Sequence, residues 1–152
     1  MNLVVEPARP EDAADVSRLL SDYLTRTELE KKSAHGLDVP EELPERYRRE
    51  IDHPAELLEH TLVARQPPRT IGLVIMRNNE IKRLWVDEQA RGTGAGRALV
   101  EAALTKAAPG PVTLTVWDWR TAPIRLYRSL GFEVSPSWDA REHLICLTYP
   151  SR

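Results

Sequence analysis

The fold of this chain is decided by the stretch Glu80-Ile-Lys-Arg-Leu-Trp-Val-Asp-Glu-Gln-Ala-Arg-Gly-Thr-Gly-Ala-Gly-Arg-Ala-Leu-Val-Glu-Ala-Ala-Leu104. Apolar, β-branched and aromatic residues at its start predict a mostly buried strand that ends at Val86. From Ala95 onward, apolar residues recur at helical spacing and predict a helix. Three glycines lie between the two elements at alternate positions: Gly92, Gly94 and Gly96. Because glycine adopts positive φ and has no side chain, a ligand can approach the main chain at this turn.

The start of the predicted helix is suited to an anion. Its first N–H groups have no partner within the helix, and the helix dipole places positive charge there. Arg91 and Arg97 flank the glycines, so a phosphate is the most plausible ligand. A P-loop would need a lysine after its second glycine, and a dinucleotide fingerprint would need glycine where Arg97 stands. Neither of these two phosphate-binding motifs is therefore present.

The motif that does match is Gln89-x-x-Gly92-x-Gly94, preceded by a strand of the form Glu-Ile-x-x-Leu-x-Val. At these residues the sequence resembles the GNAT superfamily of acyl-CoA-dependent N-acetyltransferases, whose pyrophosphate signature is Gln/Arg-x-x-Gly-x-Gly/Ala. The resemblance implies acetyl-CoA as co-substrate and no metal. It also implies that the diphosphate is bound by one loop and the helix start that follows. The residues are Arg91, Gly92, Thr93, Gly94, Ala95, Gly96 and Arg97.

A second family motif appears later as Pro123-Ile-Arg-Leu-Tyr127-Arg-Ser-Leu-Gly131-Phe132. Members usually read Asn-x-x-Ala-Ile-x-Leu-Tyr-x-x-x-Gly-Phe. This chain has Arg120 in the place of the asparagine and Pro123 in the place of the alanine. The asparagine often contacts the pantetheine arm of the cofactor, and Arg120 could reach a phosphate instead. We therefore expect Arg120 among the cofactor-binding residues.

The resemblance also implies where the chemistry takes place. In the family, the strand before the glycine turn splays from its neighbour, so the main chain of Leu84, Trp85 and Val86 would hold the pantetheine and polarise the carbonyl. Tyr127 stands where members place a tyrosine beside the thioester sulfur, and a phenol near pKa 10 can protonate a thiolate. Glu80 stands where the histone-acetylating branch has a general base. Two structural alternatives stay open: a packed core tyrosine and a solvated carboxylate beside a turn.

The periodic segments predict an α/β (α+β) fold of GNAT type. We expect a mixed, mostly antiparallel central sheet of about seven strands, flanked by about four helices, in a single domain over residues 1–152. A dinucleotide-binding domain would place the glycine turn after a parallel strand near the start of the chain, so the element order argues against a dehydrogenase. The expected strands cover 2–6, 61–65, 70–77, 80–86, 112–117, 132–138 and 142–149, and the expected helices cover 10–31, 45–52, the segment from 95 and the segment from 121 to 130.

The composition is that of a globular protein of 152 residues, with 41% hydrophobic and 29% charged residues. A net charge of −2 provides no basic field for nucleic acid or an anionic membrane, and no apolar run is long enough to span a bilayer. The N-terminus lacks the features of a signal peptide, and the single cysteine excludes an internal disulfide. Four scattered histidines lack metal-ligand spacing. We therefore expect a cytoplasmic protein without a metal.

The expected activity is transfer of an acetyl group from acetyl-CoA directly to a primary amine. The acceptor is a small molecule, or a peptide or protein amine. An alternative is a non-catalytic acyl-CoA-binding regulatory module. Many relatives pair, so a homodimer is a further expectation. Four acidic residues between Asp38 and Glu45 either decorate a helix start or attract a cationic substrate.

Overall fold

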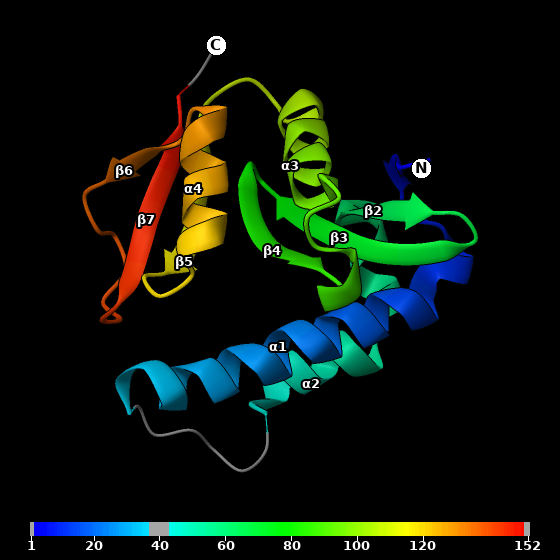
Figure 1. The fold of residues 1–152 in the computed structure, drawn as a ribbon, viewed down its shortest axis with the longest axis horizontal. Helices are drawn as coiled ribbons and strands as arrows, with labels where there is room; N and C mark the ends of the chain where they lie inside the picture. Colours follow the sequence, from blue (N-terminus) through cyan, green and yellow to red (C-terminus); the bar gives the residue numbers. More distant parts are fainter. Residues whose placement is uncertain (1, 37–42, 151–152) are drawn as a thin grey trace.

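The computed structural model of the chain describes residues 2–36 and 43–150. These residues form a seven-stranded sheet, four α-helices and three short 3-10 helices (Figure 1). The elements are β1 (Val4–Pro7), η1 (Pro10–Asp12), α1 (Ala13–His35), α2 (Glu45–Asp52), η2 (Pro54–His60), β2 (Thr61–Gln66), β3 (Arg69–Arg77), β4 (Glu80–Val86), η3 (Glu88–Ala90), α3 (Ala95–Lys106), β5 (Val112–Trp117), α4 (Thr121–Leu130), β6 (Glu133–Ser135) and β7 (Leu144–Tyr149). Three members of the acidic cluster, Asp38, Glu41 and Glu42, lie outside the described residues, so its interpretation stays a prediction.

The sheet is mixed and mostly antiparallel, as expected. Its strand order is β1-β2-β3-β4-β5-β7-β6, and all neighbours are antiparallel except β4 and β5. Asn78 and Asn79 both take positive φ in the turn between β3 and β4, which is the conformation that a tight hairpin requires. The parallel pair is joined through α3, because parallel strands need a long crossover. The predicted fold class is thus confirmed.

Two apolar cores lie on opposite faces of the sheet. One packs α3 and α4 against the strands and includes Leu99, Val100 and Phe132. The other packs α1 against the strands and includes Leu19 and Leu20. Figure 1 shows α1 and α2 together on the side of the sheet away from α3. Both faces are therefore covered by helices, as a layered α/β arrangement requires. None of the helices within 2–36 and 43–150 combines the length and apolar character of a membrane span.

Several element boundaries differ from the expectation, and two of them have a clear local cause. Helix α1 continues to His35, because the residue that ends it in the left-handed conformation is Gly36, with φ of +62°. Strand β6 ends at Ser135, well short of the predicted residue 138. Pro136 follows it, and proline has no N–H to donate to the ladder. In both places a single residue fixes the boundary.

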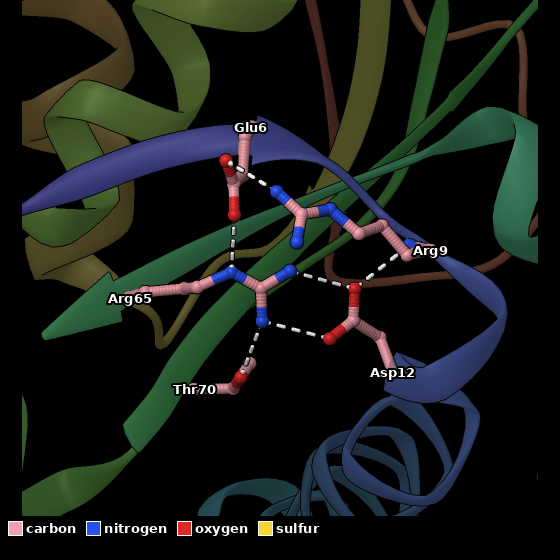
Figure 2. Close-up of polar contacts among 5 residues, drawn as sticks. All are labelled: Glu6, Arg9, Asp12, Arg65 and Thr70. Atoms are coloured by element: carbon pink, nitrogen blue, oxygen red, sulfur yellow. Dashed lines mark hydrogen bonds and ion pairs between the residues drawn. The ribbon is translucent and has the colours of Figure 1, made fainter. Parts of the chain in front are cut away.

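A cluster of charged side chains joins β1 and η1 to β2 and β3 (Figure 2). The guanidinium of Arg65, on β2, donates to both carboxylate oxygens of Asp12 at 2.7 Å and to Oε1 of Glu6 at 2.6 Å. It also donates to the hydroxyl of Thr70 at 2.9 Å, and the backbone N–H of Arg9 donates to Asp12 at 2.7 Å. Because the hydrogen bonds from Arg65 favour the charged carboxylate, the pKa of Asp12 is lowered from its usual value.

We expect Asp12→Asn to lower the free energy of unfolding at pH 7 by about 2 kcal/mol, because charge-assisted hydrogen bonds are lost at a buried position. Since the folded-state pKa of Asp12 is lowered, this contribution is complete above the ordinary aspartate range and disappears as the pH falls through the folded-state pKa. Urea unfolding at pH 7 and at about pH 3 measures both effects. Asp15→Asn, on an ion-paired side chain that is 47% exposed, is the control. Equal losses in the two variants would refute the prediction.

Candidate active site

Strands β4 and β5 separate soon after they pair. Only the first two residues of β4 are in register with β5, opposite Thr113 and Leu114. At the same place the register between β3 and β4 shifts and skips Lys82, which is the extra residue of a β-bulge. A bulge bends its strand, so residues 83–86 leave the direction of β5. The splay that the family resemblance implied is therefore present.

The glycine turn follows β4 and leads into α3. Gly92 and Gly94 have φ of +81° and +86°, and a Cβ built on either would meet no atom within 4 Å. Gly94 is the N-cap of α3, and the first helical bond runs from the N–H of Ala98 to its carbonyl oxygen at 3.0 Å. The N–H groups of residues 95–97 thus have no acceptor four residues earlier within the helix. Open main chain and free donors make this turn fit the diphosphate of coenzyme A.

A cleft of about 550 Å³ runs along these elements, and we call it the glycine-turn cleft. It is lined by every expected cofactor-binding residue except Thr93. These are Leu84, Trp85, Val86, Arg91, Gly92, Gly94, Ala95, Gly96, Arg97 and Arg120. The hydroxyl of Thr93 instead donates to the carbonyl oxygen of Ala90 at 2.6 Å, which closes the turn. The structure therefore brings together residues that are up to 36 positions apart in the sequence, from Leu84 to Arg120.

The two arginines of the glycine turn lie at the rim of this cleft. The guanidinium of Arg91 stacks 4.7 Å from the ring of Trp85. Arg97 donates to the hydroxyl of Ser129 at 3.1 Å and forms an ion pair with Glu101 at 3.3 Å. The side chain of Arg97 is 51% exposed, and Arg91 is exposed as well. Both arginines can therefore turn toward a ligand.

Arg120 has a different environment from the other two arginines. Its guanidinium donates to Oε1 of Glu30 at 3.0 Å and to the hydroxyl of Thr27 at 2.6 Å, both on α1. Only 12% of its side chain is exposed. These contacts hold the connection before α4 against α1, and a contact of Arg120 with phosphate stays a prediction.

Tyr127 is buried on α4, with 5% of its surface exposed. Its ring packs edge to face with Phe132 at 5.6 Å. It lines a cavity of about 110 Å³ on the far side of β4, which we call the inner pocket. Leu84, Arg120 and Pro123 line both openings, so the inner pocket and the glycine-turn cleft adjoin at the splay. Burial raises the pKa of the Tyr127 phenol, so it stays protonated at neutral pH.

Glu80 lies at the start of β4, before the bulge. Its carboxylate is 36% exposed and forms an ion pair with Lys82 at 2.9 Å. It lines neither the glycine-turn cleft nor the inner pocket, but a third cavity of about 400 Å³ that shares Ile81 and Arg83 with the inner pocket. The structure thus places Glu80 and Tyr127 in adjoining cavities, and the role of Glu80 as a base stays a prediction.

Trp119 and Glu30 also line the glycine-turn cleft, although neither was among the expected cofactor-binding residues. Trp119 stacks on Trp117 at a centroid distance of 5.0 Å, and its Nε1–H donates to Glu30 at 2.9 Å. Glu30 itself reaches the cleft from α1. Trp119 was visible only as one of several tryptophans, and no spacing rule links it to a glutamate 89 residues away. Within the described ranges, no group of three or more potential metal ligands comes together.

Comparison with known proteins identifies the class to which this fold and site belong. Residues 58–134 match the family of the acetyltransferase (GNAT) domain. This segment covers half of the chain and includes β4, the glycine turn, α3, β5 and Tyr127. The chain therefore belongs to the GNAT acetyltransferase family.

Individual relatives agree with this assignment. A peptidyl-lysine N-acetyltransferase, YjaB of Salmonella typhimurium, is 35% identical over 65 residues, and this alignment spans 43% of each protein's length. The solution structure of apo YjaB from Escherichia coli has a TM-score of 0.64 at 22% identity, with full coverage of both chains. The ribosomal-protein-S18-alanine N-acetyltransferase of Escherichia coli has a TM-score of 0.67 at 19% identity, covering 99% of this chain and 94% of that one. At such identities these structures establish a shared fold.

Proposed function

We propose that this protein is an acetyl-CoA-dependent N-acetyltransferase that transfers an acetyl group directly to a primary amine, and that residues 1–152 act as one catalytic domain. The observation that carries the proposal is the junction of the glycine-turn cleft with the inner pocket beside buried Tyr127. One opening suits a long phosphate-bearing ligand, and the other suits a small acceptor group. They adjoin where β4 leaves β5.

The chain's own groups divide the work along β4. The glycine turn and the N–H groups of residues 95–97 bind the diphosphate. The main chain of Leu84, Trp85 and Val86, freed by the splay, holds the pantetheine arm and donates to the thioester carbonyl oxygen. Bound acetyl-CoA supplies the activated acetyl group. Tyr127 holds a proton at Oη that is available to a departing thiolate, because burial keeps the phenol protonated.

The proposal is tested by titrating the protein with acetyl-CoA and NAD in parallel, followed by a free-thiol release assay with a panel of amines. We expect acetyl-CoA to bind, NAD not to bind, and thiol release to depend on the amine. Binding of acetyl-CoA without thiol release from any amine would support a non-catalytic acyl-CoA-binding module instead. Binding of NAD alone would overturn the proposal.

We expect Glu80→Gln to flatten the acid limb of the pH–rate profile. An alkyl amine has a pKa near 10 and is almost wholly protonated at pH 7, so a base that accepts its proton raises the rate as that base ionises. The measurement is kcat/KM for one amine between pH 5 and 9. Glu133→Gln, on an exposed residue of β6, makes the same chemical change away from the cavities. An acid limb that is the same in all three proteins would remove the role of Glu80.

The identity of the acceptor amine is a further part of the proposal. The matching relative from Salmonella typhimurium is a peptidyl-lysine N-acetyltransferase, so a lysine side chain is one candidate for this chain. A small amine is the other. A cytoplasmic location, a homodimer and the lack of a requirement for metal, nucleic acid or membrane remain part of the same proposal.

A further inference from the structure

The inner pocket is lined by more cationic than anionic side chains. Its lining carries five cationic side chains that converge from four parts of the chain: α1, β4, the β5–α4 connection and the β6–β7 connection. They are Lys31, Lys82, Arg83, Arg120 and Arg141. Among the described residues that line this pocket, Glu28 is the one carboxylate, and it is paired with Lys31 at 2.9 Å.

Cationic side chains still outnumber carboxylates when the neighbouring cavity that Glu80 lines is included. That cavity adds two carboxylates, Glu50 and Glu80, which are paired with Arg83 at 3.0 Å and Lys82 at 2.9 Å. It also adds two more guanidinium groups, from Arg46 and Arg77. The carboxylates that hold Arg120 and Arg141 come from outside both cavities: Glu30 at 3.0 Å and Asp139 at 2.9 Å. All five cations of the inner pocket are thus paired with a carboxylate, and the positive surplus on the acceptor side of β4 comes from Arg46 and Arg77.

Arg83 is at the centre of this arrangement. It lines both cavities, and its guanidinium lies 5.8 Å from the ring centroid of Tyr23 and 5.5 Å from that of Tyr47. Its Nε is buried without a hydrogen-bond acceptor, and 20% of the whole side chain is exposed. The exposed part of this side chain lies at the boundary of the two cavities, where a guanidinium can donate to an anionic ligand.

We infer that the acceptor is a small amine that also carries an anionic group, a carboxylate or a phosphate, which Arg83 and Arg141 bind. This inference rests on the proposed function and names the substrate class of the same site. A partly enclosed pocket with excess positive charge attracts an anion and opposes a second cation. It is the opposite of the interpretation in which the acidic residues 38–45 draw in a cationic substrate.

Three acceptors of matched length test the inference: 5-aminopentanoate, pentylamine and 1,5-diaminopentane. They present the same primary amine with a carboxylate, a methyl group or a second amine at the other end. We expect kcat/KM for 5-aminopentanoate to exceed that for pentylamine by at least about tenfold, since a hydrogen bond to a charged group has that effect, and the diamine to react least. A second pair, 3-aminopropanoate and 2-aminoethyl phosphate, shows which anion is preferred.

Variants of Arg83 test whether the inner pocket causes the preference for an anionic amine. Arg83→Gln should reduce the ratio of kcat/KM for 5-aminopentanoate to that for pentylamine to near one, and Arg83→Lys should restore part of it. Arg128→Gln removes the same charge from an exposed residue of α4 and should leave the ratio unchanged. Equal reactivity of the three matched amines, faster reaction of the diamine, or preference for a lysine peptide over 5-aminopentanoate would overturn the inference.

Calorimetric binding of the same amines to the protein with coenzyme A separates this inference from the proposed function. Preferential binding of 5-aminopentanoate without thiol release would support the anion site and overturn the acetyltransferase. Thiol release without any preference among the amines would support the acetyltransferase and overturn the anion site. Neither binding nor release with any of the amines would overturn both.

Discussion

Replacing Gly94 with aspartate is expected to weaken the binding of acetyl-CoA at least about 100-fold. Gly94 has φ of +86° and faces open space at the N-cap of α3. Aspartate is among the side chains that best tolerate this left-handed conformation, so the chain should still fold. Its carboxylate would occupy the place that we assign to the diphosphate and would repel it. The measurement is the dissociation constant of acetyl-CoA by calorimetry.

A matched control for this variant exists elsewhere in the chain. Gly36 also has positive φ, of +62°, and also faces open space, but it ends α1 and lines none of the three cavities of the site. Gly36→Asp should therefore bind acetyl-CoA as the parent protein does. If Gly94→Asp binds acetyl-CoA normally while folded, the diphosphate does not lie at this turn and the proposed function loses its main support.

The second large effect is expected at Tyr127. Tyr127→Phe should lower turnover at least about tenfold, because it removes the proton that we assign to the departing thiolate. The affinity for acetyl-CoA should change little, since the phenyl ring keeps its packing against Phe132. In the parent protein the raised pKa of Tyr127 keeps the phenol protonated, so turnover should not fall through its ionisation up to about pH 10.

Tyr149→Phe controls for the loss of a phenol beside the same core residue. Tyr149 also packs on Phe132, at 5.4 Å, but it lies on β7 and lines none of the three cavities of the site. Single-turnover rates with one amine, together with calorimetric binding of acetyl-CoA, compare the two variants. Unchanged turnover in Tyr127→Phe would leave this residue with a packing role only.

The sequence could predict the cofactor side of the site because the relevant signals are local. The glycines at alternate positions, the flanking arginines and the helix periodicity all lie within one short segment, and local backbone chemistry decides its shape. The order of elements along the chain followed from the same kind of reasoning, as at the Asn78-Asn79 hairpin between β3 and β4. Where the prediction missed a boundary, as at His35, one glycine further along the chain determined it.

The acceptor side could not be predicted because it is assembled from distant segments. Lys31, Arg83 and Arg141 meet in one pocket, although none of them belongs to a recognisable motif. The packing of α1 across the sheet, through residues such as Leu19, brings them together. A sequence pattern does not show which charged side chains will face one another after such packing. The same limit applies to Glu30 and its contact with Trp119.

The additional residue at Lys82 also changes which side of the sheet each later position of β4 faces. Before it, odd-numbered Ile81 contributes to the core beneath α3, whereas after it the even-numbered Leu84 and Val86 do so, and Trp85 joins the core beneath α1. Deletion of this one amino acid would restore regular alternation along β4, with Ile81, Leu84 and Val86 still facing one hydrophobic layer and Trp85 the other. The deletion would therefore keep both hydrophobic layers but remove the bend that turns β4 away from β5.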